Sequence, residues 1–362
     1  MWRGLYPPQA IFAKKKFRKV LLNPPAFEPG SWSGAGKLWI DEEDGEYWLT
    51  SRPRLRPEKR GYAVEIYRSR DGENYDLVTQ ITKEELSEFI GKTVQSIENQ
   101  QFLRDPLTGN YHLYLSIDVA ERNIAGVPER VFESKWETYL LVAEDPAGPW
   151  KPWGFALKGD KDYDSGEARD STIDIVDGRY FCLYKARKAG TGIVHMALAV
   201  SSDGKNWRKL GVLTVDGKQQ PDYFLLNGSI FAGSSGPVFI GTKTLDSVNG
   251  AALTKYFVSY VIDYRSLNLE EIFSIKWTPG SRYEHQEYPI HTYCGVNYDS
   301  FNSRWLIWVE AVDPISSKEP GLNTEVDRVL LYESKVKKVI FPIKRENIVK
   351  REEYASQAPS FF

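Results

Sequence analysis

Residues 175–186 read IVDGRYFCLYKA, a tight Asp-Gly turn followed by the apolar, aromatic-rich run that is typical of a strand. Similar phrases occur at four other places, for example EEDGEYWLTS at residues 42–51. Their turns are marked by Gly45, Gly109, Gly178, Gly236 and Ser303, which stand 64, 69, 58 and 67 residues apart. Five units of about 65 residues therefore fill the chain, and a period of this length is typical of repeat architectures.

A second phrase recurs within the units. SRDGENYDLV (69–78) and SSDGKNWRKL (201–210) each follow a strand-like run, and AEDPAGPWKPWG (143–154) is a looser copy. We interpret this phrase as the turn between the third and fourth strands of a unit. Four antiparallel strands repeated about an axis form the blades of a β-propeller, in which each blade needs its neighbours to cover its apolar faces.

The sequence thus predicts an all-β fold, a five-bladed β-propeller that forms a single domain over residues 1–362. The blades are expected roughly at these ranges: 31–80, 93–155, 166–215, 222–278 and 286–345. The early run KFRKVLL (16–22) is expected to close the ring by pairing with the last blade. A helix is expected over 82–92, with Thr82 and Glu85 as a capping box. Two packed β-sandwiches are the alternative fold, but they would not explain five phased turns.

Composition and charge argue against several classes of protein. A net charge of −2 and a pI near 6.2 disfavour a nucleic-acid partner, which requires a basic surface. No secretory signal and no run of 18 or more apolar residues is visible, so we expect a cytoplasmic protein without a membrane partner. Cys182 and Cys294 lie in apolar runs and are expected to be buried, reduced thiols. The four histidines offer no Cys/His pair with zinc-ligand spacing, and the oligomeric state stays open.

Candidate functional residues are sought just before the innermost strand of each blade, because these positions gather at one mouth of the central channel. The candidate catalytic residues are carboxylates: Asp170, Glu98, Asp222 and Glu287. The candidate substrate-binding residues are Trp32, Ser33, Arg169, Asn99, His291 and Tyr293. Each group also has a structural interpretation, since Asp170 could pair with an arginine, Asp222 could form a turn, His291 could be a hydrogen-bonded strand residue and Trp32 could belong to the core.

Several carboxylates at one aromatic-rich mouth suit the cleavage of a glycosidic bond. One carboxylic acid protonates the leaving oxygen, while a second carboxylate activates water or attacks the anomeric carbon. Catalytic groups held by different blades make the wide gap of an inverting enzyme easier to build, so inversion is expected.

Local phrases resemble those of the five-bladed β-propeller glycoside hydrolases of families 43, 32 and 130. DGEYWLTS (44–51) and DGRYFCLYKA (177–186) are similar to the inner hairpins of that superfamily, and AEDPAGPW (143–150) and SSDGKNW (201–207) are similar to its blade turns. ARDSTIDIVDGRYFCLY (168–184) resembles the blade-three Asp motif. The resemblance implies that Asp170 orients and tunes the catalytic acid or stabilises the transition state.

Two shorter matches are partial. IENQQF (97–102) resembles the Glu-Asp-Pro-Arg motif of the phosphorylases only at Glu98, and SWSGAG (31–36) is similar to a Trp-Ser-Gly segment of the sucrose-acting propellers. Enzymes of families 43 and 32 carry an Asp before the first inner strand, where this chain has Ser33 to Gly36. Blade four has no clear acid Glu and leaves Asp222 as the substitute.

The resemblance implies a glycoside hydrolase whose partner is an oligosaccharide or glycoside, such as an arabinofuranoside or xyloside. A β-mannoside-type phosphorylase and a non-catalytic glycan-binding propeller stay open as alternatives. No cofactor is expected, but some relatives hold a metal ion or a water molecule on the axis, and His291 would lie beside it in this chain.

Overall fold

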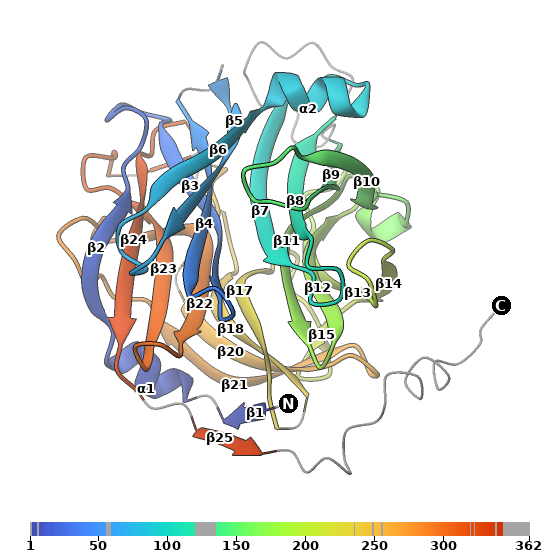
Figure 1. Ribbon diagram of the computed structural model, residues 1–362. Coiled ribbons are helices and arrows are strands. Elements are labelled where there is room, and N and C mark those ends of the chain that lie inside the picture. The colour runs from blue at the N-terminus through green and yellow to red at the C-terminus, as the bar shows by residue number, and fades with distance from the viewer. Residues whose placement is uncertain are drawn as a thin grey trace.

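The computed structural model describes residues 2–5, 7–55, 59–119, 135–234, 236–247, 250–254, 256–318, 320–321, 323–336 and 339–342. Most of this part of the chain is β-strand (Figure 1). None of its helices combines the length and the apolar character needed to cross a membrane.

Twenty of the described strands pair into five antiparallel groups of four, which we name blades I to V. Short parallel contacts of β9 with β11 and of β24 with β3 join some of these groups into larger sheets. Blade I contains β3 (Trp32–Asp41), β4 (Glu46–Arg54), β5 (Ala63–Ser69) and β6 (Asp76–Thr82). Blade II contains β7 (Ser96–Arg104), β8 (Tyr111–Asp118), β9 (Trp136–Ala143) and β10 (Lys151–Leu157). Blade III contains β11 (Glu167–Val176), β12 (Arg179–Arg187), β13 (Val194–Ser201) and β14 (Arg208–Val212). Blade IV contains β17 (Leu225–Ala232), β18 (Pro237–Thr244), β20 (Tyr256–Asp263) and β21 (Asn268–Lys276). Blade V contains β22 (Ile290–Asp299), β23 (Arg304–Val312), β24 (Asp327–Ser334) and β2 (Lys16–Leu22).

The other described elements are short. The remaining strands are β1 (Trp2–Leu5), β15 (Thr214–Val215), β16 (Lys218–Gln219), β19 (Leu253–Thr254) and β25 (Val339–Pro342). The helices are α1 (Pro8–Ala13), α2 (Lys83–Ile90) and a 3-10 turn at Asp162–Asp164. Figure 1 shows α2 near the start of β7 and the paired strands β1 and β25 at the opposite end of the molecule.

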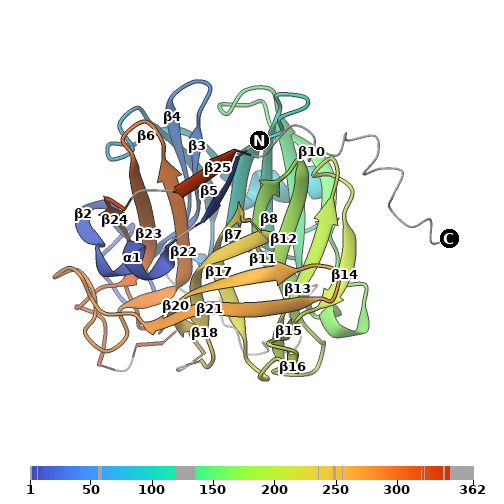
Figure 2. The ribbon, with the colours of Figure 1, turned by 90° about the horizontal axis from the view of Figure 1, so that it is seen from below.

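The five blades form a closed ring. Each inner strand contacts the next in the order β3, β7, β11, β17 and β22, and β22 contacts β3 again. The ring is closed within blade V, where β2 pairs with β24 from Lys16↔Glu333 to Leu22↔Val329. Figure 1 shows the dark blue β2 beside β24, and Figure 2 shows β20 and β21 of blade IV side by side from below. The predicted closure through residues 16–22 is confirmed.

The core lies between the blades, one apolar cluster at each interface. Phe102 and Leu113 of blade II pack with Val64 of blade I, for example, and Leu331 of blade V packs with Leu49 of blade I. The other three clusters join blades II and III, III and IV, and IV and V. The two cysteines belong to two of these clusters as buried free thiols, as expected. Each blade thus has both faces covered only when the ring is complete.

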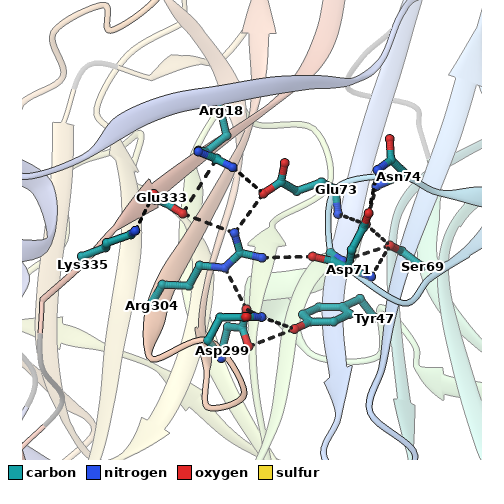
Figure 3. A network of polar contacts seen from close by, with 12 residues as sticks. Arg18, Tyr47, Ser69, Asp71, Glu73, Asn74, Asp299, Arg304, Glu333 and Lys335 are labelled. Carbon is teal, nitrogen blue, oxygen red and sulfur yellow. Dashed lines mark hydrogen bonds and ion pairs between the residues drawn. The ribbon is translucent and has the colours of Figure 1, made fainter.

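A polar network reinforces the closing blade (Figure 3). Arg304 of β23 donates to Asp299 Oδ2 at 2.8 Å and to Glu73 Oε1 at 2.9 Å, and Glu73 belongs to the last turn of blade I. Arg18 of β2 donates to the same Glu73 oxygen at 2.9 Å. Figure 3 shows Arg304 between these carboxylates. The network therefore connects blade I to both the second and the outermost strand of blade V.

The repeated Ser-x-Asp-Gly phrase forms the turns that the sequence predicted. Ser69 Oγ accepts hydrogen bonds from the backbone N–H groups of Asp71 and Gly72 at 3.2 and 2.9 Å, between β5 and β6. Ser201 Oγ accepts the same two bonds at the same distances, between β13 and β14. The two phrases therefore fold into one local structure in two different blades.

Candidate functional site

Side chains from blades II, III and V meet at the end of the ring where the inner strands begin. Glu98 stands on β7, Arg169 and Asp170 on β11, and Tyr293 on β22. Arg169 Nη1 contacts the Glu98 carboxylate and also donates to Asp170 Oδ1 at 3.4 Å. The Tyr293 hydroxyl donates to the same Asp170 oxygen at 3.2 Å. We call these four residues the axial cluster, and it unites two candidate carboxylates with two candidate binding residues.

Asp170 has an unusual backbone conformation for a strand residue. Its φ is 50°, and the pairing of β11 with β12 is interrupted between Arg169 and Thr172. A β-bulge redirects the side chains next to it, and residues other than glycine keep a positive φ only where surrounding contacts hold them. The Asp170 backbone N–H donates to Ser116 Oγ of blade II at 2.9 Å. The bulge thus turns the Asp170 carboxylate toward Tyr293 of blade V.

Glu167 fixes the cations of this region. It is 1% exposed and contacts Arg169 Nε at 3.0 Å, Lys185 Nζ at 3.0 Å and Arg187 Nε at 2.8 Å. The Arg169 guanidinium also lies 4.3 Å from the centre of the Trp136 ring, a cation–π contact. Glu167 binds the Nε atom of Arg169, and the Trp136 ring packs against the face of its guanidinium group. These two contacts fix the position of Arg169 Nη1 between Glu98 and Asp170.

The outer edge of the axial cluster reaches solvent. The side chains of Glu98 and Arg60 are 13% and 12% exposed, and those of Arg169 and Lys185 are each 10% exposed. Arg60 Nη2 contacts Glu98 Oε1 at 3.3 Å. Asp170 is more deeply placed, with 4% of its side chain exposed. A ligand at this mouth would therefore meet Glu98 and the cations before it reached Asp170.

The two carboxylates of the axial cluster have opposite pKa shifts. Burial raises the pKa of Asp170, although Arg169 and Lys185 act in the other direction. Burial also disfavours the charged form of Glu98, but Arg169 and Arg60 hold the pKa of Glu98 well below its usual range. Neighbouring groups whose environments separate their pKa values in this way can act as a proton donor and a permanent anion.

A second group of ionisable side chains lies in blade V. Glu310 on β23, Glu325 just before β24 and Asp327 on β24 are all 0% exposed, and we call them the acid cluster. Burial raises the pKa of Glu310 and of Glu325 to about 8 and raises the pKa of Asp327 well above its usual range. His291 Nδ1 lies 2.8 Å from Asp327 Oδ2 and 3.6 Å from Glu325 Oε1. The imidazole and two carboxylates could therefore hold a metal ion.

Glu310 fills the space beside blade I where the sequence shows no carboxylate. A Cβ atom on Gly34 would lie 3.0 Å from Glu310 Oε1 and 2.7 Å from Arg52 Nη2. A side chain at position 34 would therefore shift the ends of both charged side chains. Burial opposes the charge of Arg52, but Glu310 and Glu98 together raise the pKa of Arg52. Arg52 thus couples the acid cluster electrostatically to the axial cluster.

Sequence reasoning missed the acid cluster and two of the three cations around Glu167, namely Lys185 and Arg187. A signal for Glu310 was present, because it is the only acidic residue in the apolar run RWLIWVEAV (304–312) of β23. Glu325 and Asp327 follow the loop from β23, and their return to His291 depends on the pairing of β22, β23 and β24. The sequence prediction considered only the innermost strand of each blade. It could not place Glu310 on the second strand of blade V or Asp327 on the third.

Comparison with known proteins gives the fold a context. No protein-family model and no curated protein matches the sequence. The structure is similar to a family 117 glycoside hydrolase from the marine bacterium Zobellia galactanivorans, with a TM-score of 0.57 and 13% identity over 96% of this chain and 99% of that one. It is also similar to the β-1,2-mannobiose phosphorylase of Listeria innocua, with a TM-score of 0.53 and 12% identity over 89% and 97%. The chain has the fold of the propeller glycoside hydrolases.

That fold also carries other chemistry on sugars. An N-acetylgalactosamine deacetylase from F. plautii has a TM-score of 0.57 and 13% identity, over 89% of this chain and 95% of that one. Identities this low establish the fold alone, so the activity of this propeller has to be argued from its own side chains. The resemblance found in the sequence is confirmed at the level of the fold.

Two predicted catalytic residues lie away from the axial cluster. Asp222 and Glu287 are exposed, and no contact of either side chain with the axial cluster is present among the described residues. Asp222 belongs to the turn before β17, where its carbonyl accepts from Val194 N at 2.7 Å. Glu287 lines a surface pocket of about 290 Å³ with His285 and Lys318. Both residues come three positions before their inner strands, β17 and β22. They therefore stay outside the site that we propose below.

The predicted sugar platform at Trp32 is also corrected. Trp32 is 1% exposed, and the Arg54 guanidinium covers its ring at 4.0 Å from the centre. The His291 ring meets it edge-on with 4.8 Å between centroids, and Trp32 Nε1 donates to the Glu325 carbonyl at 3.0 Å. With its faces and edge occupied, Trp32 belongs to the core, and a sugar ring has no access to it.

Ser33 and Asn99 are occupied by neighbours within the protein. Ser33 Oγ donates to the Asn23 carbonyl at 2.7 Å, and Asn99 Oδ1 accepts from Gln101 Nε2 at 3.1 Å. Both residues are at least nine-tenths buried. Their contacts position the starts of β3 and β7, so we assign them structural roles instead of the predicted roles in substrate binding.

Proposed function

We propose that the chain is a glycoside hydrolase and that it cleaves its substrate at the axial cluster. The observation that carries the proposal is the placement of Asp170, a carboxylate with a strained backbone held between a tyrosine hydroxyl and two cations. Strained residues and ionisable groups with shifted pKa values gather at active sites. An oligosaccharide or glycoside is the substrate that suits paired carboxylates at a propeller mouth.

Asp170 takes the role of general acid. Its raised pKa favours a protonated carboxyl group, and the Tyr293 hydroxyl and Arg169 fix the orientation of Oδ1. A carboxylic acid held in this way can donate its proton to the leaving oxygen as the glycosidic bond breaks. In the second half of the reaction, water attacks the glycosyl group that is bound to the nucleophile. Asp170 then acts as the base and takes up the proton of that water.

Glu98 takes the role of nucleophile. Arg169 and Arg60 keep it ionised, and it is the more exposed of the two carboxylates. Both carboxylates contact the same Arg169 nitrogen and therefore lie close together. Retaining enzymes hold their two carboxyl groups about 5–5.5 Å apart, and inverting enzymes hold them about 6.5–9.5 Å apart. The shared contact therefore favours retention of configuration over the inversion expected from the sequence.

The test is hydrolysis of aryl α-arabinofuranosides, β-xylosides, β-fructosides and β-mannosides. We expect Asp170→Asn and Glu98→Gln to lower kcat about 10²–10⁴-fold on the substrate that is cleaved. Asp222→Asn and Glu287→Gln neutralise exposed carboxylates and serve as matched controls with unchanged rates. Proton NMR of the first product is expected to show the retained anomer.

Two results would overturn the proposal. Undiminished hydrolysis by Asp170→Asn would remove Asp170 from the chemistry. If no glycoside is cleaved but a glycan raises the melting temperature, the propeller binds sugars without cleaving them.

Phosphorolysis is the second candidate, and one observation favours it. Three partly exposed cations, Arg60, Arg169 and Lys185, stand at the mouth, where the sequence indicated Arg169 alone. Guanidinium and ammonium groups are the usual partners of phosphate. Each of the three already contacts a carboxylate, which is why hydrolysis ranks first. Sugar release that depends on added phosphate would reverse this order.

A further inference from the structure

Three ligand groups for a cation converge between β22 and β24. His291, Glu325 and Asp327 each offer one atom, and these atoms all lie within 4.8 Å of one another. His291 Nδ1 lies 2.8 Å from Asp327 Oδ2 and 3.6 Å from Glu325 Oε1. Ligands bonded to one ion at about 2.1 Å are separated by roughly 3–4 Å. A small closure of this group would therefore bring all three atoms into coordination.

The carboxylate oxygens of this group lack partners within the protein. Glu325 Oε1, Glu325 Oε2 and Asp327 Oδ1 are buried, and within the described residues none of them has a hydrogen-bond partner. Both residues are 0% exposed. Buried carboxylates are normally paired or bound to a metal, because an uncompensated charge inside a protein costs several kcal/mol. Three buried oxygens without a partner, beside an imidazole nitrogen, form a donor set that could bind a cation.

The neighbouring arginines do not supply that cation. Arg54 Nη2 donates to Asn323 Oδ1 at 2.8 Å, and its guanidinium lies over Trp32. Arg52 Nη2 lies beside Gly34. Among the described residues, neither Glu325 nor Asp327 forms an ion pair with an arginine, and His291 is the one ionic partner that both share. Both arginines favour the charged forms of Glu325 and Asp327 only from a greater distance. The space between the three ligands can therefore take a further positive charge.

We propose that His291, Glu325 and Asp327 bind one divalent cation of the zinc or manganese type. One imidazole nitrogen with two carboxylate oxygens suits these ions, whereas calcium and magnesium prefer oxygen ligands alone. Resemblance to other propellers pointed only to His291, and the two carboxylates come from the structure. The ion would tie β22 to the start of β24, where Asp327 pairs with Trp32 of blade I. Its role is to lock blade V onto blade I.

The experiment uses the full chain after treatment with a chelator. Titration calorimetry with ZnCl₂ and MnCl₂ should give one bound ion per chain, and either ion should raise the melting temperature by a few degrees. Glu325→Gln and Asp327→Asn keep the shape of each side chain and should weaken binding at least about 10-fold. Glu287→Gln removes an exposed glutamate outside this group and is the matched control with unchanged affinity. None of these readouts depends on the cleavage of a glycoside, so a failure of the proposed hydrolysis is recognised separately.

Other results would overturn the cation site. Absence of stoichiometric binding by the chelated wild type, or unchanged affinity in Glu325→Gln, would contradict it. A third outcome is that neither the wild type nor Glu325→Gln binds an ion and that the variant has the higher melting temperature. This outcome would show that the carboxylates are held as neutral acids. Circular dichroism confirms that each variant is folded before its affinity is compared.

Discussion

Asp170 combines strain, burial and charge in one residue. A positive φ costs a residue other than glycine about 1–3 kcal/mol, so the contacts with Ser116, Arg169 and Tyr293 have to offset that cost. Asparagine adopts the left-handed region about as readily as aspartate. Asp170→Asn should therefore keep the backbone conformation at this position while it removes the carboxylic acid. The substitution is expected to lower the rate of hydrolysis without a large change in the free energy of unfolding.

His112 makes the fold sensitive to acid. It is buried, and burial lowers the pKa of His112 to about 4, below the ordinary value of 6.5. The folded state therefore keeps His112 neutral, while the unfolded chain takes up a proton as the pH falls below 6.5. The stability linked to His112 is complete above pH 6.5 and is lost between pH 6.5 and 4, by about 3 kcal/mol in total.

Replacement of His112 checks this dependence. His112→Gln has no titrating group, so its free energy of unfolding should change less between pH 7 and 4.5 than that of the wild type, by roughly 2–3 kcal/mol. Urea denaturation at the two pH values provides the measurement. Parallel loss of stability in both proteins would assign the acid sensitivity to other groups.

The sequence predicted that the four residues of the axial cluster would meet, because all of them lie near the starts of inner strands. Glu98, Arg169, Asp170 and Tyr293 all lie within the first four residues of an apolar inner strand, and that order along the chain places them at the mouth. Asp222 has the same kind of neighbours, but it stands three residues before β17 and stays at the surface. A shift of a few residues decides between axis and solvent, and sequence patterns do not fix strand starts that closely.

At the scale of elements, the phased turns explain why the strands could be predicted. Each Ser-x-Asp-Gly phrase ends the third strand by its own hydrogen bonds, so its position depends little on the rest of the fold. The predicted helix over 82–92 is confirmed as α2 for the same reason, with a capping box between Thr82 and Glu85 and Gly91 in the left-handed region. The loop from β23 to β24 carries no comparable local signal, and Glu325 was missed with it.

The turn after β13 also makes a contact that a shared phrase cannot predict. A Cβ on Gly204 would lie 2.7 Å from Tyr114 Oη and 2.9 Å from His112 Nδ1, whereas a Cβ on Gly45 would meet nothing within 4 Å. Both glycines have positive φ, 69° and 71°. Gly45→Ala should cost about 1–2 kcal/mol from backbone strain alone. Gly204→Ala should cost about 1–3 kcal/mol more, because Tyr180 of the same blade and the side chains of blade II have to move away.

Thermal or urea unfolding of the two alanine variants measures this difference directly. Equal destabilisation would mean that the contact between the blade III turn and blade II contributes nothing beyond the conformation of the glycine. A larger loss for Gly204→Ala would show that the packing of this turn against Tyr180 and against blade II adds to the conformational cost.

At the scale of the whole molecule, stability depends on closing the ring. Five apolar clusters lie at five blade interfaces, so an open chain would expose two blade faces at once. The last interface is made by strands from both ends of the described chain, β2 with β24 and β3 with β22. The period along the sequence predicted this arrangement, but the polar network that supports it joins residues more than 200 positions apart and could not be predicted.

Arg304 offers a test of that closure. It is largely buried and donates to Asp299, Glu73 and Glu333, whereas Arg18 binds the same Glu73 oxygen with 41% of its side chain exposed. Removal of one partner from a buried ion pair costs about 3–5 kcal/mol, and removal of an exposed partner costs about 1 kcal/mol or less. Arg304→Gln should therefore lower the urea midpoint strongly and Arg18→Gln only slightly. Because blades I and V share this network, Arg304→Gln should still unfold in one transition, and a separate early transition confined to blade V would contradict the idea that the ring closes as a unit.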